Sequence, residues 1–171
     1  MIIAISGLTG SGKNTLGEAL AKSFDFPLVC PTFKDLAKEE GISLLDFQKK
    51  AAKDHTIDRK FDQLLKKQAK GNCVVTTWLG PWMLDADFRI YVFAPLDTRA
   101  SRIAKRDTMI LEEAKKHILK RDEQNRERYL KVYGIDIYDT SSFDICLNSA
   151  LFSKELVCDT VRAILKIKKF I

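Results

Sequence analysis

The sequence predicts an α/β protein in which a parallel β-sheet is covered by helices on both faces. Short apolar runs rich in β-branched residues alternate with longer helical patterns along the whole chain. The runs are continuously apolar, as expected for strands that are buried on both faces. The first run leads directly into a glycine-rich turn and a helix, which is the order of elements in proteins of this class.

The expected elements follow one another in a regular order. We expect strands at Ile2 to Ser6, Leu28 to Cys30, Cys73 to Thr77, Phe88 to Phe93 and Phe143 to Leu147. We expect helices at Lys13 to Ser23, Phe33 to Glu40, Ser43 to Lys53, Ile57 to Lys70, Leu96 to Arg106, Leu111 to Val132 and Ser153 to Lys169. Ser43 is a favourable N-cap, with Asp46 three residues later. Five such strands form a doubly wound sheet, which binds ligands at the carboxyl ends of its strands.

Length and composition indicate one globular domain over residues 1–171. No apolar run is long enough to cross a bilayer, and the amino terminus does not resemble a signal peptide, so we expect a cytoplasmic protein without a membrane partner. The formal net charge of +6 favours anionic ligands. Lysines are spread along the chain instead of clustering with aromatic residues, which argues against a nucleic-acid partner.

The most specific motif is the segment Gly-Leu-Thr-Gly-Ser-Gly-Lys, which begins at Gly7 and fits G-x-x-x-x-G-K. It lies between a buried strand and a helix, the context that supports a phosphate-binding loop. Glycines allow backbone N–H groups to converge on an anion, and the following helix directs its positive dipole end to the same place. Lys13 is expected to reach the β- and γ-phosphates of ATP. The predicted ATP-binding residues are Gly7, Leu8, Thr9, Gly10, Ser11, Gly12, Lys13, Asn14 and Thr15.

Two successive helices carry arginines at helical spacing. Arg99, Arg102 and Arg106 share one face, and Arg121, Asn125 and Arg128 share a face of the next helix. A solvated charged face is the ordinary interpretation of such a stripe. Phosphoryl transfer, however, needs cations around an anionic centre, and guanidinium groups stay charged and bind phosphate through a planar fork. We therefore expect a catalytic lid made of Arg102, Arg106, Arg121 and Arg128. Arg99, Lys105 and Arg126 are expected to be surface residues.

The order G-S-G-K-x-T resembles nucleoside monophosphate kinases, and the rest of the chain narrows the resemblance. The matching segments are Phe93 to Arg106, Arg121 to Tyr129, Tyr133 to Asp139, Phe33 to Glu39 and Ile57 to Asp62. They resemble cytidylate kinases of the archaeal type. The resemblance implies ATP-dependent phosphorylation of CMP or dCMP and a P-loop fold with strand order 2-3-1-4-5. It also implies a monophosphate-binding region at 31–71, a lid at 101–132 and a core at 1–30, 72–100 and 133–171. ATP would act with Mg²⁺ held by nucleotide oxygens and waters, with Thr15 nearby and in indirect contact.

The chain departs from this family mainly at the expected acceptor site. Lys34 and Trp78 stand where the family usually has arginines that contact the acceptor nucleotide, and Asn125 stands where bacterial relatives carry an aspartate near the cytosine. Trp78 either stacks on the acceptor base or packs within the core or lid. Asp58 and Asp62 match the family's D-x-x-x-D pair, which either orients basic groups or ribose or consists of ordinary surface acids. The predicted acceptor-binding residues are Lys34, Asp58, Trp78 and Asn125.

The sequence is therefore compatible with three functions. The first is a kinase for CMP or dCMP. The second is a kinase on the same scaffold with another acceptor, such as AMP, UMP or a phosphorylated molecule that is not a nucleotide. The third is a nucleotide-dependent binding protein without catalysis. The survival of the phosphate loop and of the arginine-bearing helices favours the first.

Overall fold

The computed structural model describes residues 1–43, 46–47, 50, 54 and 56–168, with only the backbone of Phe33 and Lys34. All strands of its single five-stranded sheet are parallel, in the order β2-β3-β1-β4-β5. The strands are β1 Ile2–Ser6, β2 Leu28–Val29, β3 Cys73–Thr76, β4 Phe88–Phe93 and β5 Ile145–Asn148. The helices are α1 Lys13–Phe24, α2 Phe33–Glu39, α4 Thr56–Gln68, α5 Gly80–Met83, α6 Leu96–Asp107, α7 Leu111–Tyr133 and α8 Lys154–Ile167. The predicted fold class and strand order are confirmed.

Most expected elements differ from the observed ones by one or two residues at their ends. The short helix α5 was not expected, and it begins with the Gly80-Pro81 pair, where proline suits the first turn. The helix expected at Ser43 to Lys53 lies largely outside the described residues. Its predicted cap is present, because the Asp46 N–H donates to Ser43 Oγ at 3.1 Å.

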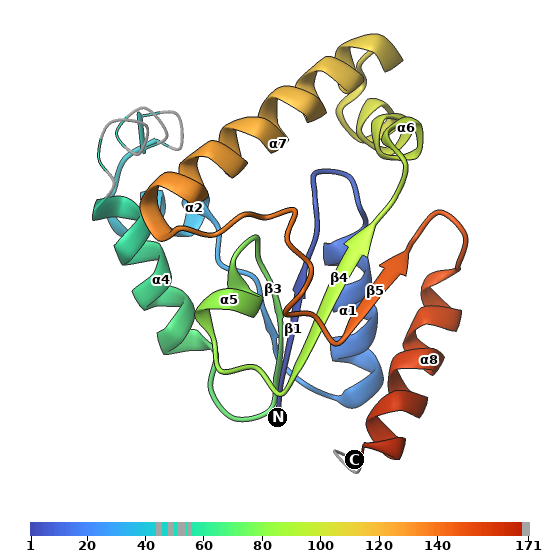
Figure 1. Ribbon diagram of the computed structural model, residues 1–171. Coiled ribbons are helices and arrows are strands. Elements are labelled where there is room, and N and C mark those ends of the chain that lie inside the picture. Colours follow the sequence, from blue (N-terminus) through green and yellow to red (C-terminus); the bar gives the residue numbers. More distant parts are fainter. Residues whose placement is uncertain (44–45, 48–49, 51–53, 55, 169–171) are drawn as a thin grey trace.

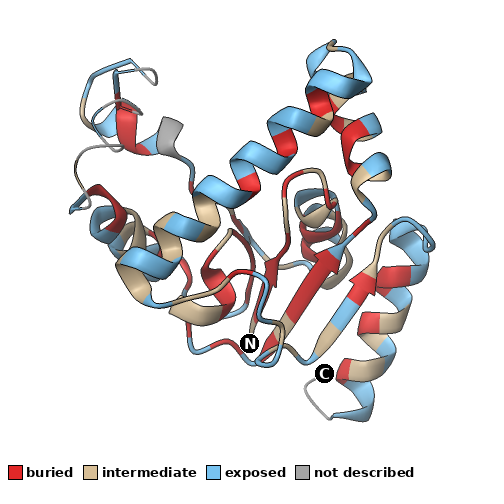
Figure 2. Ribbon diagram, turned by 45° about the horizontal axis from the view of Figure 1, so that its top comes forward, coloured by how far each residue is buried: buried red, intermediate tan, exposed pale blue. Residues whose placement is uncertain are grey.

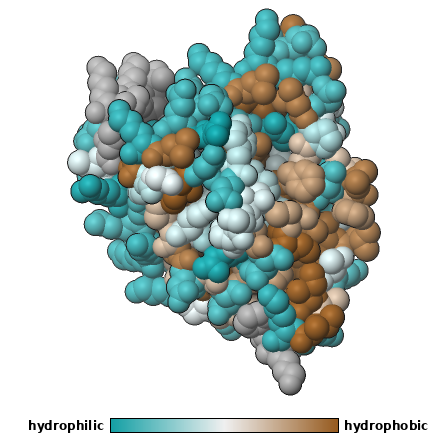
Figure 3. Space-filling model, viewed as in Figure 1, coloured by the Kyte–Doolittle hydropathy of each residue, from teal (hydrophilic) through white to brown (hydrophobic). Residues whose placement is uncertain are grey.

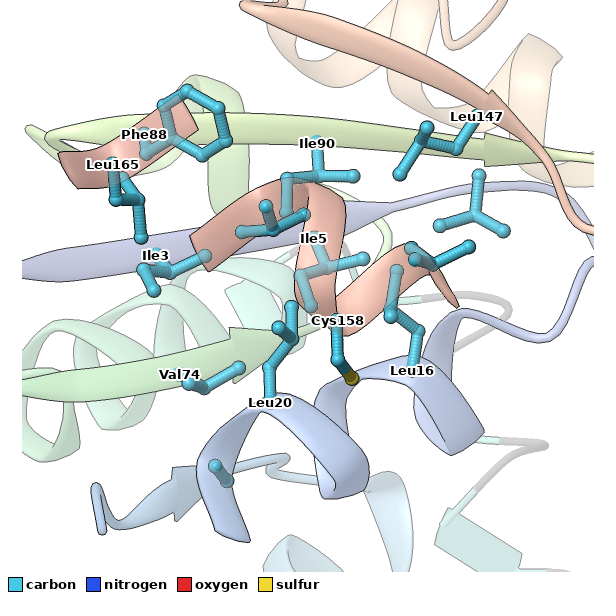
Figure 4. Packing of buried hydrophobic residues seen from close by; sticks show 14 residues of the cluster. Ile3, Ile5, Leu16, Leu20, Val74, Phe88, Ile90, Leu147, Cys158 and Leu165 are labelled. Atoms are coloured by element: carbon cyan, nitrogen blue, oxygen red, sulfur yellow. The ribbon is translucent and has the colours of Figure 1, made fainter. Parts of the chain in front are cut away.

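Helices cover both faces of the sheet (Figure 1). Side chains of the strands alternate between the two faces, as the period of a β-strand requires. Ile3 and Ile5 pack with α1 and α8, whereas Val75 faces α4 on the opposite side. Figure 4 shows the larger of these two cores, where Leu16 and Leu20 of α1 and Leu165 of α8 meet the strands. The central strands β1 and β3 are almost wholly buried, so the sheet is a packed platform for the loops at its carboxyl edge.

The helices α6 and α7 lie over the carboxyl ends of the strands, and α7 runs back from α6 toward α2 and α4 (Figure 1). They share a small apolar core of their own, formed by Ala100, Ile103, Ala114 and Ile118. The rest of α7 is mainly exposed or half-buried (Figure 2). No helix within the described ranges is long and apolar enough to cross a membrane.

Candidate active site at the phosphate loop

The loop between β1 and α1 adopts a conformation that only its glycines permit. Gly10 and Gly12 have φ angles of 77° and 91°, in the left-handed region that favours glycine. A Cβ atom added to Gly10 would lie 2.8 Å from the Arg99 carbonyl oxygen, so the loop is pressed directly against α6. The first turn of α1 holds no acidic residue. Its N–H groups and positive dipole end therefore stay suited to an anion.

Lys13, the first residue of α1, directs its ammonium group toward Trp78. Its Nζ atom lies 5.0 Å from the centroid of the Trp78 ring. Burial of the ammonium and repulsion from Arg121 lower the pKa of Lys13 from its ordinary value of 10.5 to about 8, although the residue keeps partial exposure. Asp122 acts in the opposite direction and raises the pKa of Lys13, but more weakly. An anionic ligand would offset burial and repulsion, because it adds negative charge beside the buried cation.

Two of the predicted lid arginines lie within electrostatic reach of Lys13. Arg121 and Arg106 both lower its pKa by repulsion. Arg121 is exposed on α7. Arg106 is exposed near the end of α6 and binds Asp107, with 2.7 Å between Arg106 Nε and Asp107 Oδ1. Charges from both lid helices therefore act on Lys13, and that of Arg121 acts more strongly than that of Arg106.

A row of aromatic rings extends from Lys13 along α7. The Trp78 and Tyr129 ring centroids are 6.3 Å apart, and those of Tyr129 and Tyr133 are 6.5 Å apart. Trp78 is half-buried. In the ligand-free protein Trp78 lies between Lys13 and Tyr129 of the lid helix, and its stacking on the acceptor base stays a prediction. Burial raises the pKa of Tyr129, so this phenol stays protonated at neutral pH.

Ion pairs and hydrogen bonds connect α4 to α7 beside this aromatic row. Arg128 Nη2 lies 2.9 Å from Asp58 Oδ1, and Asp58 is 5% exposed. The Tyr133 hydroxyl donates to Asp62 Oδ2 at 2.5 Å. Asp58 and Asp62 are therefore bound to groups of the lid helix, so of the two alternatives left open the structure favours the one in which the pair orients other groups. Arg128 is thus held by an ion pair with Asp58 of α4.

The remaining predicted acceptor residues are only partly placed. Asn125 is half-buried on α7, one turn from Arg121. Lys34 lies in the first turn of α2, whose N-cap Thr32 forms a capping box with Asp35. The side chain of Lys34 lies outside the described residues.

On the other side of the phosphate loop, Arg102 of α6 closes a pocket of about 300 Å³. Its Nη1 atom donates to the carbonyl oxygens of Gly10 and Ser11, each at 3.2 Å, and its Nη2 atom donates to the Ser149 carbonyl at 2.8 Å. Thr15 and Phe152 also line the pocket. Figure 3 shows a brown, hydrophobic surface on this side of the molecule, and the exposed apolar residues there include Leu151, Phe152 and Leu156. The pocket therefore combines an apolar rim with polar groups from the loop.

The expectation that Arg99 is a surface residue was wrong. It is 7% exposed and pairs with Asp122, and the Arg99 Nη1 and Asp122 Oδ2 atoms are 2.6 Å apart. Arg126, also expected at the surface, is half-buried and pairs with Asp136. Lys105 is exposed, as predicted.

A sequence signal for the buried pair was present. Asp122 continues the stripe of Ala114 and Ile118 at four-residue spacing, and these are the buried residues of α7. An acidic residue on the buried stripe of a helix needs a cationic partner. That requirement pointed to an arginine on the neighbouring helix, such as Arg99.

Carboxylate ligands for a resident metal ion are missing from this site. No group of three or more His, Cys, Asp or Glu residues in the described ranges could hold a metal ion. Thr15 is exposed beside the pocket, and a single hydroxyl is too small a ligand set for Mg²⁺. This chemistry fits a magnesium ion that is held mainly by the phosphates of a nucleotide.

The parallel sheet, the phosphate loop at its centre and the two arginine-bearing helices above it define a P-loop protein with the fold of small kinases. Solved structures with this fold include shikimate kinase from Acinetobacter baumannii, which is 13% identical in sequence and superposes with a TM-score of 0.64. The match covers 98% of this chain and 94% of the shikimate kinase chain. Deoxyadenosine kinase from M. mycoides is 20% identical, with a TM-score of 0.58, covering 95% of this chain and 100% of that one.

The model of the cytidylate kinase-like family matches residues 2–151, and the chain belongs to this family. A cytidylate kinase from Pyrococcus horikoshii is 42% identical over 167 residues, which is 95% of this chain and 87% of that protein. A cytidylate kinase from Ignicoccus hospitalis is 39% identical and covers 96% of this chain and 98% of that protein.

Proposed function

We propose that this protein transfers the γ-phosphoryl group of ATP to CMP or dCMP. The observation that carries the proposal is the glycine-rich loop with Lys13 at the start of α1, bound by Arg99 and Arg102 of α6, in a chain related over nearly its full length to cytidylate kinases. The relatives favour this function over the two others that the sequence left open. In the transfer, the bond from the γ-phosphorus to the bridging oxygen of ADP breaks, and a bond to a phosphate oxygen of the acceptor forms.

The order of the strands supports opposite places for the two nucleotides. The phosphate loop follows the central strand β1, the pocket with Arg102 lies toward β4 and β5, and Trp78 follows β3 on the other side. We assign the base of ATP to the pocket and the acceptor to the side of Trp78. The two phosphate chains then meet in front of Lys13, which favours in-line transfer by positioning alone.

Each group in the site has a proposed role. The loop Gly7 to Thr15 and Lys13 bind the ATP phosphates, and Arg106 and Arg121 stabilise the charge of the transferred group. Mg²⁺ would be held by the ATP phosphates with Thr15 nearby, where it supplies further positive charge. Arg128, bound to Asp58, and Asn125 serve the acceptor side together with Lys34 and Trp78. Residues 31–71 form the monophosphate-binding region, and 101–132 form the lid.

ADP release measured with a panel of acceptors tests the proposal. CMP, dCMP, UMP, AMP and GMP are titrated at saturating ATP and Mg²⁺, with Lys13→Met as the inactive control. We expect the highest kcat/KM for CMP or dCMP. A higher value for AMP or GMP would refute the pyrimidine assignment, and the absence of phosphorylation of all five would refute the kinase itself.

A further inference from the structure

A buried ion pair holds one residue of the phosphate loop by both of its backbone groups. Arg99 of α6 and Asp122 of α7 are 7% and 2% exposed. Arg99 Nη1 donates to the Thr9 carbonyl oxygen at 3.1 Å. The Thr9 N–H in turn donates to Asp122 Oδ1 at 3.1 Å. Thr9 is therefore fixed by charged side chains from both lid helices.

Arg99 is part of a wider contact between α6 and the loop. Arg102, one turn later on the same helix, donates to the carbonyl oxygens of Gly10 and Ser11. Three consecutive carbonyl groups of the loop thus point toward arginines of α6. In a trans peptide the N–H of the next residue points the opposite way, so the Gly10 and Gly12 N–H groups are directed away from α6. Backbone N–H groups arranged in this manner are what an anion-binding loop requires.

We infer that Arg99 and Asp122 are positioning residues that hold the phosphate loop in its ATP-binding conformation and connect it to α7. The inference rests on the proposed function for the identity of the ligand. A loop with glycines at positive φ is costly to order, and a loop that is already ordered spares ATP this cost on binding. Asp122 also follows Arg121 directly, so the same contact positions that arginine relative to Lys13.

The charges of the pair make the inference specific. Asp122 places a buried carboxylate beside a site for anionic phosphates, and Arg99 neutralises it at 2.6 Å. Removing the arginine alone would leave that carboxylate uncompensated, which both destabilises the protein and repels ATP. Removing both charges avoids this penalty, because an asparagine oxygen still accepts the Thr9 N–H. The double variant should therefore bind ATP better than the variant that lacks Arg99 only.

The test compares Arg99→Met, Asp122→Asn and the double variant with the wild type. ATP binding is measured by calorimetry in the presence of Mg²⁺, and kcat and the KM for CMP are measured separately. We expect Arg99→Met to weaken ATP binding by roughly 10- to 100-fold while the KM for CMP changes by less than about 3-fold. We expect the double variant to recover only part of the lost ATP affinity, because the bond from Arg99 to the Thr9 carbonyl is still missing, and we expect Asp122→Asn to lower kcat through Arg121.

A second ion pair of the chain provides the matched control. Arg126 of α7 and Asp136 form a pair with 2.8 Å between Nη2 and Oδ2, partly exposed. The same substitutions, Arg126→Met and Asp136→Asn, should leave ATP affinity unchanged. Unchanged ATP affinity in Arg99→Met, or a double variant that binds ATP as tightly as the wild type, would overturn the inference.

Two further measurements keep the result decisive. If Arg99→Met is too unstable to purify, Arg99→Lys keeps the charge and should bind ATP more tightly than Arg99→Ala at a temperature where both are folded; equal affinities would overturn the inference. Calorimetry with ATP does not depend on turnover. A wild type that binds ATP but phosphorylates no monophosphate would therefore refute the proposed function and leave the order of ATP affinities as a valid test of the pair.

Discussion

The ammonium of Lys13 lies 5.0 Å from the centroid of the Trp78 ring, so the cation that the loop presents to ATP rests on an aromatic face in the ligand-free protein. Such a contact stabilises the cation by about 0.5–2 kcal/mol. Burial and the nearby Arg121 act in the opposite direction and lower the pKa of Lys13 to about 8. Burial and repulsion outweigh the aromatic contact, because lowering the pKa of Lys13 from 10.5 to about 8 corresponds to about 3 kcal/mol. The free site therefore carries a charge that costs stability until a phosphate binds.

Lys13→Met should abolish turnover and stabilise the ligand-free protein at pH 7 by about 1–3 kcal/mol. The folded pKa of about 8 lies below the ordinary 10.5. The unfolded state therefore binds more protons between these values, and the stability of the wild type rises with pH across this window. The advantage of the variant should be full below pH 8 and should shrink toward pH 10.5. Urea unfolding of both proteins at several pH values measures this difference in the free energy of unfolding. A variant less stable than the wild type at pH 7 would contradict the assignment of Lys13 as a buried, destabilising cation.

Binding of ATP should be coupled to proton uptake by Lys13 at mildly alkaline pH. At pH 8.5 less than half of the Lys13 side chains are protonated in the free protein, given the pKa of about 8. Bound phosphate raises this pKa, so we expect uptake of roughly half a proton or more per ATP. Calorimetry at pH 8.5 in two buffers with different ionisation enthalpies gives this number directly. The proton uptake due to Lys13 should vanish at pH 6.5 in the wild type and at any pH in Lys13→Met. Equal proton uptake in Lys13→Met and the wild type at pH 8.5 would assign the uptake to another group.

The fluorescence of Trp78 should report ATP binding. Trp82, the second tryptophan, packs edge-on against Phe143 with 4.9 Å between ring centroids, whereas Lys13 lies over Trp78. In a Trp82→Phe variant only Trp78 emits. When the ammonium moves from the ring to a phosphate, the emission of Trp78 should change with the same Kd that calorimetry gives. The complementary variant, Trp78→Phe, should show little change, and a full response from Trp82 would contradict the placement of Trp78.

The sequence was sufficient to predict the platform of the site. The phosphate loop and the parallel strands were predictable because glycine positions, buried strands and one helix start determine them locally. The contacts of the arginines were not, because helical spacing shows which residues share a face but not what that face meets. Arg99 and Arg102 are one turn apart on α6, and both donate hydrogen bonds to carbonyl groups of the phosphate loop, a contact that their spacing alone does not show. Arg128 shares its face with Arg121, yet it binds Asp58, which lies 70 residues earlier in the chain.

The lid arginines should divide into two kinetic classes. Arg121→Ala and Arg106→Ala remove the two lid cations whose charge acts on Lys13, so they should lower kcat by roughly 10³-fold or more, as loss of a transition-state arginine does. Arg128→Ala releases Asp58 on the acceptor side and should mainly raise the KM for CMP. Steady-state kinetics with each substrate varied in turn separates the classes. Arg126→Ala on α7 is the control, and values of kcat and KM within a few-fold of wild type in all three variants would refute a role of these arginines in transfer and acceptor binding.

The acceptor side offers the sharpest test of substrate choice, because Trp78 stands where the family usually has an arginine. A stacked indole contributes about 1–3 kcal/mol to base binding without selecting pyrimidine over purine. A missing charge-assisted hydrogen bond costs about 1.5–3 kcal/mol, which corresponds to a KM higher by about 10- to 150-fold. We therefore expect CMP to be the preferred acceptor with a high KM and with loose discrimination against purines.

Trp78→Arg separates these contributions. It restores the cation and removes the ring, so the KM for CMP should fall and discrimination against AMP should change. It also places a positive charge beside Lys13 in place of an aromatic face. Repulsion should lower the pKa of Lys13 further. As the pH rises, Trp78→Arg should therefore lose ATP affinity at a lower pH than the wild type does. Trp78→Phe should keep the wild-type pH dependence of ATP affinity. A KM for CMP that is the same in Trp78→Arg, Trp78→Phe and the wild type would place Trp78 outside the acceptor site and restrict its role to Lys13.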